Sequence, residues 1–223
     1  MFSARRLVVV FGSCCLWAGT LADQRHLRHT PTTHSTIPDF YHPDILEELH
    51  DLCRAQRHIE CFESNGIPYA VLTGVDPSVH DVVIALQHSR ELIAGEVALH
   101  LLRKHAAQKP PHTLVLVPVV NICATKRVWA GEHSLRTSCS GIDLNRQYTD
   151  VRGAHKCEHH YNRNDGYQEF PGEQALSEPE SKLVVDLLLK YKPRTFLNIH
   201  SARVCLLCSS PPLSTHLLTS TTG

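Results

Sequence analysis

The run HTLVLVPVV at residues 112–120 is the feature that most constrains how this chain can fold. It is almost uninterrupted in apolar character and rich in valine, which is typical of a strand buried on both faces. Strands of that kind occur mainly in parallel sheets that are covered by helices. Three shorter runs of similar character, at residues 66–75, 81–86 and 194–200, predict further strands of the same sheet.

Segments with helical periodicity separate these runs. Apolar side chains recur at helical spacing in residues 43–56, 91–105 and 177–191. The prolines of QKPP end the second helix, and Ser177 with Glu180 predicts a capping box at the start of the third. The alternation predicts an α/β fold, a mixed, mostly parallel twisted sheet flanked by helices, with a long loop-rich region at residues 121–172.

Charge and length exclude several classes of function. The 223 residues are enough for one sizeable core, and 22 Lys plus Arg residues balance 22 Asp plus Glu residues. The formal net charge is therefore zero, and the sequence has no block of basic residues of the kind that binds nucleic acid or an anionic membrane. We therefore expect no nucleic-acid partner.

The amino terminus has the pattern of a secretory signal peptide at residues 1–22. Arg5 and Arg6 precede a short apolar run, and small residues lie before Asp23. The alternative is an uncleaved anchor. Cleavage predicts a protein that is secreted or lies in the lumen of the secretory pathway, with no membrane association. It removes Cys14 and Cys15 and leaves seven cysteines in an oxidising compartment. We expect residues 23–40 to be a disordered leader, residues 41–208 to fold, and residues 209–223 to be an unstructured tail.

His88 and Glu91 lie where the strand at residues 81–86 gives way to a helix, and His200 ends the strand at residues 194–200. An H-x-x-E pair alone is a weak signal, because a solvated histidine beside a capping glutamate gives the same pattern. The carboxyl ends of parallel strands meet at one edge of a sheet, where ligands bind in open α/β folds. Two histidine nitrogens and one carboxylate oxygen leave a tetrahedral zinc ion one open position, so the pattern predicts one Zn²⁺ per chain.

Asn145 and Arg146 are adjacent hydrogen-bond donors in the segment GIDLNRQY, and Arg136 lies ten residues before Arg146. A guanidinium fork matches a carboxylate in a bidentate way that lysine cannot reproduce. This pattern favours a site for an anion, although a single arginine more often forms a surface ion pair.

Four motifs, HSRE, GIDLNRQY, PGEQALSEPES and FLNIHS, occur in an order that resembles the zinc metallocarboxypeptidase family of carboxypeptidase A. The resemblance extends from about Tyr41 to Ser201. It implies a monomeric enzyme that hydrolyses the last peptide bond of peptides or proteins, with zinc bound by His88, Glu91 and His200.

The resemblance also implies roles for neighbouring residues. Asp143 would orient the first zinc histidine, and Asn145 and Arg146 would bind the C-terminal carboxylate of the substrate. Arg136 would be the catalytic arginine that stabilises the oxyanion, with Arg127 as the alternative. The family resemblance further implies a disulfide between Cys139 and Cys157, while the pairing of the other cysteines stays open: Cys53, Cys61, Cys123, Cys205 and Cys208.

The chain also departs from the family pattern. Its residues 121–124 read Asn-Ile-Cys-Ala where the family has Asn-Pro-Asp-Gly, and residues 201–223 contain no Asp or Glu that could act as the family's general-base glutamate. We therefore expect a fragment of a longer enzyme that has no turnover by itself. One alternative is a non-catalytic relative that binds zinc or peptide C-termini. Another is a structural metal or redox site at Cys205 and Cys208, with His159 and His160.

Overall fold

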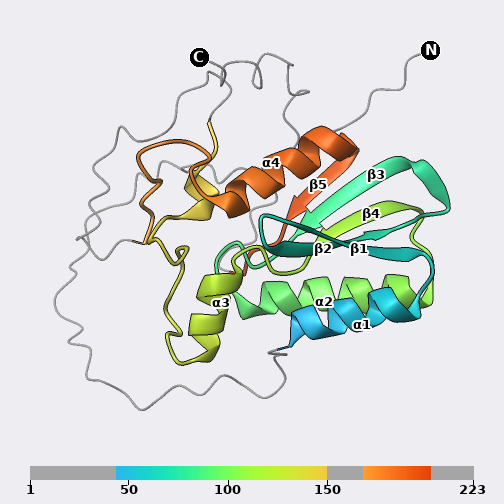
Figure 1. Ribbon diagram of the computed structural model, residues 1–223, viewed down its shortest axis with the longest axis horizontal. Coiled ribbons are helices and arrows are strands. Elements are labelled where there is room, and N and C mark those ends of the chain that lie inside the picture. Colours follow the sequence, from blue (N-terminus) through green and yellow to red (C-terminus); the bar gives the residue numbers. More distant parts are fainter. Residues whose placement is uncertain (1–43, 150–167, 202–223) are drawn as a thin grey trace, which may run out of the picture.

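The computed structural model describes residues 44–149 and 168–201, which form a single five-stranded sheet between helical layers (Figure 1). The strand order is β1-β2-β4-β3-β5. β3 is parallel to both of its neighbours, β4 and β5, whereas β2 is antiparallel to β1 and to β4. The strands are β1 (Ile59–Ser64), β2 (Ile67–Leu72), β3 (Asp76–Ile84), β4 (His112–Val117) and β5 (Thr195–Asn198).

Helices cover both faces of the sheet (Figure 1). Helices α1 (Ile45–Ala55) and α2 (Leu92–Ala107) lie on one face, and α4 (Pro179–Tyr191) lies on the other. The short helix α3 (Ile122–Trp129) and the 3₁₀ turn η1 (Leu144–Arg146) follow β4. Successive residues of β3 point to opposite faces, so Val83 packs against the α1/α2 layer while Val82 and Ile84 pack against α4.

The architecture confirms the predicted α/β fold with a mixed sheet flanked by helices. Each of the four predicted strands and three predicted helices is present, and β1 and α3 are additional elements. β1 and β2 form a hairpin through Asn65 and Gly66, whose φ angles of 54° and 74° are those of an Asn-Gly turn. The predicted capping box is wrong: α4 begins at Pro179, and the hydroxyl of Ser177 donates to Oε1 of Gln147 instead.

The structure corrects one predicted disulfide. Cys139 is bonded to Cys123, with a Cα–Cα distance of 6.0 Å, and a second disulfide joins Cys53 to Cys61 at 5.8 Å. Because α3 starts directly after β4, its first turn carries Cys123 to the loop that precedes η1. Cys139 is therefore not available to Cys157, which lies outside the described residues. The bond ties the beginning of α3 to the segment that contains Asp143.

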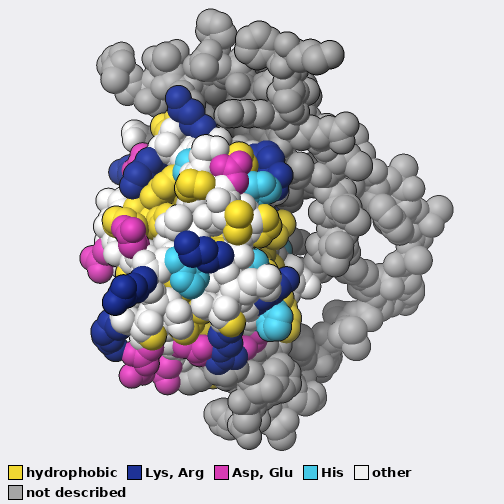
Figure 2. Space-filling model, turned by 90° about the vertical axis from the view of Figure 1, so that its right-hand side faces the viewer, with side chains coloured by type: hydrophobic (Ala, Val, Ile, Leu, Met, Phe, Trp, Pro, Cys, Tyr) yellow, Lys and Arg dark blue, Asp and Glu magenta, His cyan; other side chains and the backbone are white. Residues whose placement is uncertain are grey.

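The predicted signal peptide, leader and tail also lie outside the described residues, as do His159, His160, Cys205 and Cys208. Among the helices that are described, none combines the length and the apolar character of a membrane span. Figure 2 looks onto the right-hand side of Figure 1, and there Lys and Arg side chains are interspersed with Asp, Glu and His. That face has no continuous surface of one charge.

Candidate metal centre

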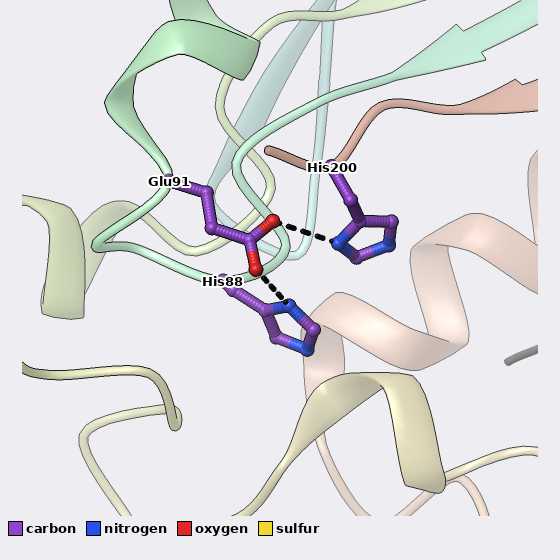
Figure 3. Close-up of side chains that lie close together, drawn as sticks. All are labelled: His88, Glu91 and His200. Atoms are coloured by element: carbon purple, nitrogen blue, oxygen red, sulfur yellow. Dashed lines mark hydrogen bonds and ion pairs between the residues drawn. The ribbon is translucent and has the colours of Figure 1, made fainter. Parts of the chain in front are cut away.

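Three side chains from two parts of the chain converge beyond the carboxyl ends of β3 and β5 (Figure 3). Nδ1 of His88 lies 2.9 Å from Oε1 of Glu91, and Nδ1 of His200 lies 2.9 Å from Oε2 of the same carboxylate. One nitrogen or oxygen from each of the three residues lies within 4.8 Å of the others. The sequence prediction that these side chains meet at one point is confirmed.

The backbone between β3 and α2 directs the first histidine. Leu86 has a φ of 50°, a left-handed conformation that is unfavourable for a branched side chain and occurs mainly where the surroundings impose it. Its surroundings do so, because its carbonyl accepts from the amide of Asn121 and its side chain packs against Gly95 of α2. The chain turns at this point, and His88 and Glu91 follow within one helical turn, with Glu91 as the N-cap of α2.

Asp143 holds the far side of His88. It is fully buried, and its Oδ1 accepts a hydrogen bond from Nε2 of His88 at 3.0 Å. Oδ2 forms an ion pair with Arg136, at 3.0 Å from Nε and 2.9 Å from Nη2. Because a carboxylate accepts from Nε2, it leaves Nδ1 to face the other ligands, as a carboxylate behind a metal-binding histidine does.

The charges of the site are coupled. Burial alone would raise the pKa of the Glu91 carboxyl, but hydrogen bonds from His200 and His88 outweigh it and hold that pKa well below its ordinary value. Burial alone would lower the pKa of His88, but its hydrogen bonds to Asp143 and Glu91 raise it. Burial likewise opposes ionisation of Asp143, whose pKa is nevertheless lowered by its contacts with His88 and Arg136. The contacts of His88 with two carboxylates therefore favour its protonated form in the metal-free site.

The donor set fits a zinc ion. Two imidazole Nδ1 atoms and a carboxylate are the ligands of a catalytic zinc site, and they leave one position open. His200 is partly buried, and its Nε2 is a buried atom with no hydrogen-bond partner among the described residues. His88, Glu91 and Asp143 are almost wholly withdrawn from water.

The structure separates the two candidate arginines. Nη1 of Arg136 lies 3.9 Å from Oε1 of Glu91, so this guanidinium borders the site. Arg127 forms an exposed ion pair with Glu132 at 2.6 Å and is engaged away from it. The predicted substrate-binding pair follows Asp143 in η1: the amide of Asn145 donates to Asp143 at 2.9 Å, and Nη2 of Arg146 lies 3.4 Å from Oε2 of Glu169.

Sequence reasoning missed a polar group beside the histidines. Gln87 is fully buried, and its side chain contacts those of Asn198 and Tyr148. The sequence contains a signal that could have revealed it. Gln87 comes directly before His88, and Asn198 comes two residues before His200, each at the end of an apolar strand.

Comparison with known proteins agrees with this site. The sequence profile described as zinc carboxypeptidase matches residues 77–216. No curated protein matches the chain. The zinc carboxypeptidase profile covers more than half of the sequence, so the chain belongs to the zinc carboxypeptidase family. Members of the family use one Zn²⁺ ion, and the group formed by His88, Glu91 and His200 is a possible site for it.

Solved structures show the same fold. Bovine thrombin-activatable fibrinolysis inhibitor, in complex with tick carboxypeptidase inhibitor, aligns with a TM-score of 0.62 and 19% identity over 72% of this chain. Carboxypeptidase A from Helicoverpa armigera aligns with a TM-score of 0.60 and 20% identity over 70% of this chain. The chain spans 60% of the length of the first relative and 44% of the second.

Proposed function

We propose that this protein is a secreted zinc-dependent metallocarboxypeptidase that removes the C-terminal residue of peptides or proteins. The observation that carries the proposal is the convergence of His88, Glu91 and His200 at one point, with Asp143 behind the first histidine. The two disulfides support an oxidising compartment. The family membership supports a peptidase reaction.

Each residue then has a physical task. Zinc, when bound, supplies a Lewis acid that polarises the scissile carbonyl and activates water. Loading requires Nδ1 of His88 to lose its proton, and Asp143 keeps the remaining proton on Nε2, which fixes the tautomer. Arg136 uses Nε and Nη2 for Asp143, and its planar guanidinium leaves Nη1 facing the site, 3.9 Å from Glu91, where it would donate to an oxyanion.

The substrate carboxylate would be bound by Asn145 and Arg146. Asp143 fixes the backbone of this turn through the amide of Asn145, so the metal centre and the proposed clamp share one rigid support. Truncating such a clamp should cost about 1.5–3 kcal/mol of substrate binding, the range for hydrogen bonds to charged groups. A peptide acid should therefore bind, and the matching C-terminal amide should not.

Proton transfer needs a group that the segment after His200 does not supply. Hydrolysis requires a base that takes a proton from water and returns it to the leaving amine, a contribution of about 10²–10⁴-fold. Residues 201–223 contain neither Asp nor Glu. We propose that a group outside residues 201–223 transfers this proton.

The same group of His88, Glu91 and His200 also fits a second candidate, a relative that binds zinc or peptide C-termini without catalysis. The two candidates differ in one assay. A carboxypeptidase loaded with zinc releases the terminal residue of a peptide, whereas a binding protein retains the peptide intact.

Zinc stoichiometry tests the centre directly. The chain, secreted into oxidising conditions and dialysed against trace zinc, should hold one zinc ion by elemental analysis. The double variant His88→Ala, His200→Ala should hold none. A matched control, His50→Ala with His100→Ala, removes two exposed histidines of α1 and α2 and should keep the metal. Equal zinc content in both double variants would refute the proposed site.

A further inference from the structure

A continuous line of side-chain hydrogen bonds runs beneath the metal centre. Nδ2 of Asn198 donates to Oε1 of Gln87 at 2.7 Å, and Nε2 of Gln87 donates to the hydroxyl of Tyr148, also at 2.7 Å. Gln87 is fully buried and Asn198 is 7% exposed. Both hydrogen-bonding ends of the Gln87 amide are therefore used by protein groups, and water does not compete strongly for them.

The line continues from Tyr148 into α4 and returns to η1. Tyr148 is hydrogen-bonded to Ser181, whose hydroxyl in turn donates to the carbonyl of Leu144 at 3.4 Å. Asn198 donates to Gln87, and Gln87 donates to Tyr148, so the first two bonds of the line point the same way. Such head-to-tail bonds strengthen one another.

The ends of this line lie beside the parts of the site. Gln87 precedes His88, and its carbonyl accepts from the side chain of Asn121 at 3.3 Å. Asn198 is the last residue of β5, and His200 follows it two residues later. Leu144 lies between Asp143 and Asn145. The line thus joins the three segments that carry the histidines and the proposed carboxylate clamp.

A core position of this kind is normally apolar. A buried amide that loses one partner costs about 1–3 kcal/mol, whereas an apolar side chain of similar size carries no such risk. An amide at position 87 is favoured only when its direction matters. Here the amide bridges the segment that follows β3 and the end of β5, the two segments that lead to the histidines.

We propose that Gln87 is a positioning residue of the metal centre, which acts through Asn198 and Tyr148 to hold His88 and His200 at the spacing that one divalent ion requires. The inference rests on the proposed zinc function, and it concerns geometry rather than direct ligation. Removing a group that supports a metal-binding histidine lowers metal affinity by about 10–100-fold. Gln87 lies one hydrogen bond further from the metal than such a group, so we expect its loss to lower the metal affinity about tenfold.

Cobalt(II) is the probe, because the intensity of its visible absorption reports the geometry of the ligands. The 223-residue chain is titrated with Co²⁺ as wild type, as Gln87→Met, as Tyr148→Phe and as the double variant. Gln87→Met should bind Co²⁺ about tenfold more weakly, with a changed visible spectrum. Tyr148→Phe, which removes one oxygen atom, should move both readouts in the same direction. The double variant should lose less than the product of the two single losses, because both changes break one line.

A matched control separates positioning from loss of stability. Thr113 is buried at the start of β4, and its hydroxyl accepts from the amide of Gly74 at 3.3 Å, at the opposite edge of the sheet. Thr113→Val should lower the melting temperature and leave both the Co²⁺ affinity and the spectrum unchanged.

Each other outcome is decisive. Wild type that fails to bind Co²⁺ would overturn the metal centre itself, and with it this inference. Wild type that binds, together with a Gln87→Met protein of unchanged affinity and spectrum, would overturn the positioning role alone. Should Gln87→Met not fold, Tyr148→Phe decides the same question. Fully multiplicative losses in the double variant would show that the two residues act separately.

Discussion

Replacement of Asp143 by alanine tests how much the support behind the metal centre contributes. The carboxylate is fully buried and accepts from His88, from the amide of Asn145 and from two nitrogens of Arg136. Its removal leaves the guanidinium, whose side chain is 12% exposed, with the more distant carboxylate of Glu91, at 3.9 Å, as its nearest ion-pair partner among the described residues. Breaking a buried pair by removing one partner costs about 3–5 kcal/mol. The remaining Glu91 favours the lower end, about 3 kcal/mol.

The effect on metal binding is separate from the effect on stability. Without Asp143, nothing fixes the Nε2 proton of His88, so zinc affinity should fall about 10–100-fold. Urea denaturation of the metal-free chain measures the loss of stability, and competition against a zinc indicator measures the loss of zinc affinity. Asp143→Asn keeps an oxygen for His88 and Asn145 but loses the charge that faces Arg136, so it should retain most of the affinity. If Asp143→Ala is destabilised but binds zinc as tightly as wild type, the orienting role is wrong.

Three other changes have definite expected outcomes. In the metal-free chain the pKa of the Asp143 carboxyl is lowered, so the stability that it contributes is present above about pH 4 and is lost as the pH falls through its folded-state pKa. The pKa of His88 is raised, so the stability that it contributes is complete below about pH 6.5 and is lost as the pH rises through its folded-state pKa. Urea denaturation across the pH range should therefore give a maximum between these limits, and a stability that still rises at pH 8 would contradict it. Gly95→Ala would place a methyl group 2.7 Å and 2.8 Å from methyl groups of Leu86 and Ile45 in the core. Thermal denaturation should therefore show a free energy of unfolding lower by about 1–3 kcal/mol, despite the better helix propensity of alanine. A higher free energy of unfolding would show that the core rearranges to accept the methyl group. The double variant Cys123→Ser, Cys139→Ser opens a link across 16 residues and should lose about 3 kcal/mol, whereas unchanged unfolding under reducing and oxidising conditions would show that the bond contributes nothing.

The sequence contained the strand and helix pattern on which the metal centre depends. Apolar runs that are buried on both faces are distinctive, and a polar residue directly after such a run must lie at the edge of the sheet. That is why the pattern alone could place His88 and His200 together. β1 escaped prediction because only Ile59 of its six residues is buried, so no alternation of apolar and polar residues marks it.

Other parts of the site depend on contacts that a linear pattern does not contain. The Cys123–Cys139 bond follows from where α3 begins, and cysteine spacing alone does not determine connectivity. The role of Gln87 depends on the two side chains that meet it, 61 and 111 residues away in sequence. Local patterns predict elements, while pairings between distant segments depend on how those elements pack.

The position of His200, two residues after β5, has a consequence for the order of folding. His88 and Glu91 belong to one corner and can come together as soon as β3 and α2 form, but Glu91 and His200 are 109 residues apart. Closing a loop of that length costs about 4 kcal/mol of chain entropy, and β5 is held in the described sheet by pairing with β3 alone. We therefore expect the third proposed ligand to arrive late, so that a partly folded chain would offer only a weak two-ligand site. Metal uptake would then report that the last described strand has joined the sheet, and detachment of that strand would be a route by which a bound ion leaves.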